Sequence, residues 1–80
     1  MAYPNLSDSR NILKETHALV KKYFPHINVV SDGWVHYYKP QRYWEFRGPN
    51  KFRWYGQAEN GYDAKRQGWT AYLKSKGMKV

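Results

Sequence analysis

The stretch that decides the fold is residues 27–56, INVVSDGWVHYYKPQRYWEFRGPNKFRWYG, in which side chains of different polarity alternate between turn sequences. Alternation with a period of two is typical of β-strands. Asp32-Gly33 suits a two-residue hairpin turn, and the proline-containing tripeptides at 39–41 and 48–50 indicate two further turns. The pattern predicts a four-stranded antiparallel meander with strands at 27–31, 34–38, 42–47 and 51–55.

The length of the loop at 48–50 sets which side chains share a face, because a slip of one residue exchanges the two faces of a strand. A three-residue loop places Phe46 opposite Phe52 and Trp44 opposite Trp54, and Asn50 suits the left-handed position of such a loop. Carried through the other turns, this parity predicts an apolar face of Ile27, Val29, Trp34, His36, Tyr38, Trp44, Phe46, Phe52 and Trp54. The opposite face is predicted to carry Val35, Tyr37, Tyr43, Glu45, Arg47, Lys51, Arg53 and Tyr55.

A helix is predicted on either side of the strands. Residues 12–24 carry apolar side chains every three or four positions, behind capping residues at 7–9, and the proline that follows ends this helix. A second helix is predicted from about 58–60 to Ser75, with Asn60 three residues ahead of Asp63, as in a capping box. It stops at Gly77.

The predicted fold class is therefore α+β, a single small domain in the order α-β-β-β-β-α. Both helices are expected to cover the apolar face of the four-stranded meander and to leave the other face open to solvent. Gly61 and Gly68 in the second helix are expected to bring its backbone close to the bulky aromatic side chains of the sheet.

Composition limits the chain to one small domain. Its 80 residues include no Cys, and three scattered His offer no structural zinc site. The core is therefore expected to form without disulfide bonds or a structural metal ion. Aromatic residues, 19% of the chain, supply the bulk that such a core needs and argue against a disordered basic tail. The domain is expected at 7–77, after a flexible lead-in at 1–6 and before a basic tail at 78–80. Since neither a signal peptide nor a membrane span is indicated, we expect a cytoplasmic protein, in the host cytoplasm if a phage encodes it.

No catalytic or cofactor-binding constellation is indicated. The Ser residues lie at predicted caps and turns, His36 is expected to face the core, and His17 lies outside the apolar stripe of the first helix. Neither glycine-rich phosphate motif occurs. The sequence therefore predicts a protein that is not an enzyme, with no catalytic residues, no metal and no cofactor.

The open face of the predicted sheet suggests a function. Between residues 39 and 53, five basic residues stand against one acidic residue, in a chain whose formal net charge is +8. Lys and Arg neutralise phosphates, and flat side chains stack on bases. We therefore predict a small nucleic-acid-binding protein, for DNA or RNA, whose binding surface consists of Arg42, Arg47, Lys51, Arg53, Tyr37, Tyr43, Tyr55, Lys65 and Arg66.

Other interpretations of this face stay open. The alternative is an acidic protein surface as the partner, as in a protein-binding inhibitor or adaptor of the kind that phages direct at host complexes. Tyr and Arg are also ordinary solvent-facing strand residues. A monomer or a weak dimer through the tyrosines is expected, with no membrane partner.

The order of elements is similar to that of two kinds of nucleic-acid-binding module. A helix, three or four strands and a helix resemble the double-stranded-RNA-binding domain, although AENGYDAKR at 58–66 stands where that family has a lysine cluster. The strands and final helix at 34–75 look like the sheet-reading DNA-binding modules of plant apetala-type transcription factors and of integrase arm-binding domains. Those modules lay a three-stranded sheet in the major groove. No motif specific to either family is present, so the similarity concerns architecture alone.

Overall fold

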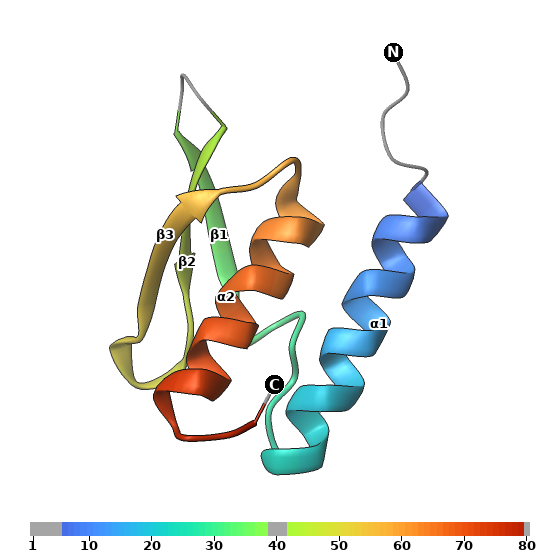
Figure 1. Ribbon diagram of the computed structural model, residues 1–80, viewed down its shortest axis with the longest axis vertical. Helices are drawn as coiled ribbons and strands as arrows, with labels where there is room; N and C mark the ends of the chain where they lie inside the picture. The colour runs from blue at the N-terminus through green and yellow to red at the C-terminus, as the bar shows by residue number, and fades with distance from the viewer. Residues whose placement is uncertain (1–5, 39–41, 80) are drawn as a thin grey trace.

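The sheet has three strands, not the predicted four. The computed structural model describes residues 6–38 and 42–79, and its strands pair antiparallel in chain order (Figure 1). The elements are α1 (Leu6–Tyr23), β1 (Trp34–Tyr38), β2 (Tyr43–Arg47), the short 3-10 turn η1 (Pro49–Lys51), β3 (Arg53–Gln57) and α2 (Gly61–Ser75). The molecule is a small α+β domain with an antiparallel sheet, as predicted.

Helix α2 lies between the sheet and α1 (Figure 1). It contacts all three strands, whereas α1 packs mainly against α2, so the prediction that both helices cover the sheet was wrong. Two inter-strand spacings make the sheet only about 10 Å wide, which is the diameter of a single helix. The core that forms between these layers consists of Val20, Ile27, Val29, Phe46, Trp69, Tyr72 and Leu73.

The segment at 27–33, predicted as a strand and a hairpin turn, folds instead around the side chain of Asn28. Its Oδ1 accepts hydrogen bonds from the backbone N–H groups of Val30 and Ser31, at 2.9 and 3.1 Å. The Asn28 N–H donates to Asp32 Oδ2 at 2.7 Å, and the Asp32 N–H donates back to the Asn28 carbonyl at 2.8 Å. These local bonds satisfy the backbone groups that a sheet ladder would otherwise use. Ile27 and Val29 are still buried, as predicted, but from a turn rather than a strand.

The faces of β1 are the reverse of the prediction. Tyr38 pairs with Tyr43, so four residues separate the two strands, whereas the predicted loop had three. Arg42, expected in the strand, has a φ of 53° and belongs to this connection; residues 39–41 lie outside the described part of the chain. The extra residue turns Trp34, His36 and Tyr38 away from the core, and it turns Val35 and Tyr37 toward the side of Phe46.

The faces of β2 and β3 agree with the prediction although their pairing does not. Phe46 pairs with Trp54, and Arg47 with Arg53, so five residues separate the strands rather than three. A shift of two residues leaves every side chain on the same face of the sheet. The Gly48 N–H donates to the Phe52 carbonyl at 2.9 Å, and Asn50 adopts the predicted left-handed conformation, with a φ of 58°.

The two ends of α2 are as predicted. Asn60 is the N-cap, and its Oδ1 accepts a hydrogen bond from the Asp63 N–H at 2.9 Å. At the other end Gly77 has a φ of 81°, which lets the Met78 N–H reach the Leu73 carbonyl at 3.0 Å. Met78, expected in the basic tail, packs against the core.

Gly68 lies where α2 crosses the buried ring of Phe46. A Cβ atom at this position would overlap the Phe46 ring, so the close approach predicted for the helix is confirmed here. At Gly61 a Cβ atom would lie 3.8 Å from the Trp44 ring, an ordinary contact, so that glycine does not serve a close approach.

No helix within residues 6–38 and 42–79 is long and apolar enough to cross a membrane.

Candidate nucleic-acid interface

The strands present one face to solvent, because α2 and α1 both lie on the other side of the sheet (Figure 1). We call this surface the open face. Its side chains form a grid of three rows across β1, β2 and β3, which follows from the strand pairing. The rows are Trp34, Arg47 and Arg53; His36, Glu45 and Tyr55; and Tyr38, Tyr43 and Gln57.

Glu45 lies at the centre of the grid and is buried although it faces away from the core. Its side chain is only 2% exposed. One carboxylate oxygen accepts a hydrogen bond from the Tyr38 hydroxyl at 2.8 Å. The other accepts from Arg47 Nε at 2.8 Å and from the Tyr55 hydroxyl at 3.1 Å. All three strands therefore contribute a donor to one carboxylate.

This hydrogen bonding shifts the acid–base equilibria of the grid. The bond from Arg47, followed by that from Tyr38, lowers the pKa of Glu45 from 4.5 to about 2, although burial opposes the change. The same carboxylate raises the pKa of the Tyr38 hydroxyl and of the Arg47 guanidinium. Glu45 is thus a carboxylate, and Arg47 a cation, throughout the ordinary pH range.

Arg47 and Arg53 occupy one end of the grid and face each other directly across β2 and β3. Two like charges in this position repel. Glu45 offsets part of the repulsion, since Arg53 Nε also lies 4.0 Å from its carboxylate. The Arg47 guanidinium lies 4.8 Å from the centre of the Trp34 ring, a cation–π contact that fixes it above the sheet. Both arginine side chains remain about half exposed, at 49% and 55%.

Aromatic rings cover most of the remaining grid. Trp34 and His36 are stacked on β1 at 5.6 Å, with an angle of 11° between the ring planes. Tyr43 and Tyr55 are stacked across β2 and β3 at 6.4 Å and 17°. Trp34, Tyr38, Tyr43 and Tyr55 are 42–47% exposed, so the open face presents rings and arginines together.

The structure brings four of the nine predicted binding residues together: Tyr43, Arg47, Arg53 and Tyr55 all lie on the open face. Lys51 lies in the η1 turn, next to the arginine end of the grid. The others lie elsewhere. Tyr37 is on the opposite face, packed against Trp44 at 5.0 Å. Lys65 and Arg66 belong to α2, where Arg66 pairs with Asp63 at 2.7 Å.

Sequence reasoning missed four members of the grid. Gln57 lies beyond the predicted end of the last strand at residue 55, and the other three are Trp34, His36 and Tyr38. All three were assigned to the core side, and the prediction of a core histidine at His36 was wrong, because that residue is exposed. A signal for the correct parity was present. Val35 pairs with Phe46, and a β-branched apolar residue suits a core position on β1 better than histidine does.

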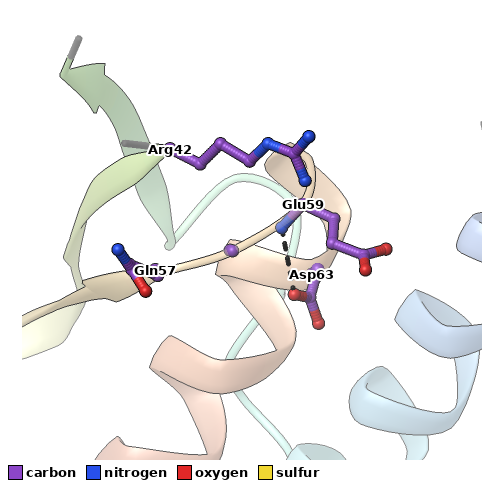
Figure 2. Close-up of a pocket in the computed structure, with 5 residues that line it drawn as sticks. Arg42, Gln57, Glu59 and Asp63 are labelled. Atoms are coloured by element: carbon purple, nitrogen blue, oxygen red, sulfur yellow. Dashed lines mark hydrogen bonds between the residues drawn. The ribbon is translucent and has the colours of Figure 1, made fainter. Parts of the chain in front are cut away.

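Arg42 lines a separate pocket of about 370 Å³ between the end of β3 and the start of α2, with Gln57, Ala58, Glu59 and Asp63 (Figure 2). Figure 2 shows the Arg42 side chain extending toward Glu59. Asp63 is already engaged there, since it accepts from the Glu59 N–H at 3.3 Å and pairs with Arg66. A pocket that combines one cation with two carboxylates does not suit a polyanion.

Within residues 6–38 and 42–79, no group of three or more His, Cys, Asp or Glu side chains is placed to hold a metal ion. No family model, curated protein or solved structure matches the chain. The candidate site therefore rests on its own geometry.

Replacing the central carboxylate tests the electrostatics of the grid. Because the pKa of Glu45 is about 2 in the folded protein and 4.5 ordinarily, the unfolded chain binds more protons between these values. The stability that Glu45 provides is therefore complete above about pH 4.5 and is lost as the pH falls toward 2. We expect Glu45→Gln to lower Tm at neutral pH and to converge with the wild type toward pH 2, as measured by circular dichroism.

Glu15→Gln, which removes an exposed carboxylate from α1, is the matched control and should follow the wild-type profile. A Glu45→Gln profile parallel to the wild type across the acid range would contradict this account of the grid.

Proposed function

We propose that this is a small non-enzymatic protein that binds nucleic acid through the open face. The observation that carries the proposal is the exposed pair Arg47 and Arg53, which face each other on a surface that neither helix covers. An anion that lies between two opposed cations reduces their electrostatic repulsion. A phosphate group is such an anion, and it matches the planar donors of a guanidinium.

The arrangement of Arg47 supports this assignment. Its contact with Glu45 uses Nε, which leaves the two terminal nitrogens of the guanidinium as donors for a phosphate. Glu45 and the Trp34 ring hold the side chain from two sides, so less conformational freedom is lost when a ligand binds. The net charge of +8 adds a long-range attraction for any polyanion.

The architecture gives further support. The three strands and α2 occupy residues 34–75, the region whose order of elements is similar to that of sheet-reading DNA-binding modules. In such modules the strands, rather than the helix, meet the nucleic acid. The open face is the corresponding surface of this chain.

Salt titration of binding tests the proposal. We expect the double variant Arg47→Ala/Arg53→Ala to bind an oligonucleotide about tenfold or more weakly, with a slope of log K against log salt that is smaller by about 1.4 for a single strand. Fluorescence anisotropy with a labelled oligonucleotide measures both quantities. The control is Lys21→Ala/Lys74→Ala, which removes two exposed charges from the helices and should change affinity much less.

Absence of binding to single strands and duplexes at about 50 mM salt would refute the proposal. So would an Arg47→Ala/Arg53→Ala variant whose affinity and salt slope match those of the wild type. An acidic protein surface would then be the partner to test.

A further inference from the structure

Tyr38 and Tyr55 reach Glu45 from the two strands that flank β2. Tyr38 comes from β1 and Tyr55 from β3, and their hydroxyls donate to the same carboxylate at 2.8 and 3.1 Å. The carboxylate is buried, so a hydroxyl that reaches it draws its ring down across the sheet instead of letting it extend into solvent. The residues are nevertheless 42% and 47% exposed, so a large part of each side chain stays open to solvent although its hydroxyl is bonded to Glu45.

Neighbouring side chains add two further rings to this surface. Tyr43 stacks beside Tyr55 at 6.4 Å, and His36 packs against Tyr38 at 4.5 Å. The grid spans four residue steps along each strand, about 13 Å, and two inter-strand spacings across. Sheet faces that carry exposed aromatic rings bind two or three stacked bases in known RNA-binding modules. The arginine pair at one end then meets the phosphates that join them.

Base stacking needs bases that are not already stacked in a duplex. A protein that reads the major groove uses hydrogen-bonding groups that point at base edges. Here the hydroxyls of Tyr38 and Tyr55 are turned inward to Glu45, so these residues offer their rings, rather than a hydrogen-bonding group, to a ligand. The arrangement therefore fits unpaired bases better than the edges of paired ones.

We propose, resting on the function proposed above, that the open face binds single-stranded nucleic acid with unpaired bases stacked on Tyr38 and Tyr55. Glu45 is a positioning residue, which holds both rings against the sheet and does not itself touch the bases. The proposal separates two effects of Glu45 that have opposite signs. As a negative charge it repels phosphates, and as an anchor for the rings it favours binding.

The experiment compares a labelled single strand of about 12 nucleotides with the duplex of the same sequence, by anisotropy at constant salt. We expect the full-length protein to bind the single strand at least about tenfold more tightly, whether the strand is DNA or RNA. The tighter of the two single strands identifies the sugar that the face prefers, and either preference supports the proposal.

Variants of the rings supply the second arm. Tyr38→Leu and Tyr55→Leu should each weaken single-strand binding by roughly five- to hundredfold, the range found for loss of one stacked base. Tyr37→Leu is the matched control: Tyr37 is the neighbouring residue, is equally exposed at 42%, and points to the opposite side of β1. It should leave the affinity unchanged in protein whose fold is verified by circular dichroism.

Glu45→Gln supplies the third arm. We expect it to weaken single-strand binding even though it removes a negative charge from the open face. If this variant does not fold, Tyr38→Phe/Tyr55→Phe replaces it, because it keeps both rings and removes only the hydroxyls that anchor them. Its affinity should lie between those of the wild type and the leucine variants.

The outcomes separate this inference from the proposed function. Equal or tighter binding to the duplex, with Tyr38→Leu and Tyr55→Leu unaffected, would overturn the inference and leave nucleic-acid binding in place. Tighter single-strand binding by Glu45→Gln would overturn the role of Glu45. No binding to any oligonucleotide at low salt would refute the proposed function itself.

Discussion

Trp69→Ala is expected to destabilise the protein by about 3–5 kcal/mol, the range for loss of a large buried aromatic side chain. Trp69 is fully buried on α2 and contacts Phe46 of the sheet at 5.2 Å between ring centres, edge to face. Its indole N–H donates to the Val29 carbonyl at 3.1 Å, in the turn that leads into β1. One side chain therefore connects α2, the sheet and the turn, and its removal opens a cavity among all three.

The destabilisation expected for Trp69→Ala is large relative to the total free energy of unfolding. A chain of this length has a free energy of unfolding of roughly 4–12 kcal/mol. Urea denaturation followed by circular dichroism gives the difference. The matched control is Trp34→Ala, since Trp34 is 46% exposed on the open face, and we expect it to change the free energy of unfolding by about 1 kcal/mol or less. Similar effects of the two substitutions would contradict the placement of Trp69 at the centre of the core.

Gly68→Ala is expected to destabilise the protein by about 1–3 kcal/mol, although alanine is the better helix former by about 1 kcal/mol. The new methyl group would overlap the ring of Phe46, which is fully buried and held by Trp69, so the ring has no free space into which to move. Either α2 lifts from β2 or the ring leaves its preferred rotamer, and both changes weaken the core.

Gly61→Ala tests the same chemical change in the first turn of the same helix. The nearest atoms to the new methyl group would be those of Trp44, at 3.8 Å, and this is an ordinary contact. We expect its stability to be unchanged or raised by up to about 1 kcal/mol. In a urea titration only Gly68→Ala should therefore lower the free energy of unfolding. Equal effects would mean that the distance between α2 and β2 adjusts freely.

The sequence predicts α2 well because its signals are local, whereas the capping residues predicted at 7–9 lie inside α1, which begins at Leu6. The capping residue Asn60 and the stop at Gly77 act within a few residues of the helix ends, and both are where the pattern places them. The turn at 27–33 is also local, yet its signal was read as a strand. Asn28 and Asp32, four residues apart, form side-chain bonds to the backbone that compete with a sheet ladder.

Which side chains share a face of the sheet depends on the lengths of the loops. The alternation of polar and apolar residues within the strands does not determine these lengths. Between β2 and β3 the predicted length was wrong by two residues, so the faces survived and Tyr43, Arg47, Arg53 and Tyr55 were placed together. Between β1 and β2 it was wrong by one, because Arg42 adopts a left-handed conformation that arginine rarely takes. That single residue put three of the five rings of the grid, those of β1, on the wrong side in the prediction.

The residues of the open face are separate from the residues of the core. No member of the grid belongs to the core, whose residues lie on the far side of the sheet, in the helices or in the turn at 27–33. Substitutions of outer-row residues that do not bond Glu45 should therefore change the chemistry of the open face without a matching loss of stability. The central carboxylate and its three partners, in contrast, depend on one another, so a redesign of the open face has to replace them as a unit.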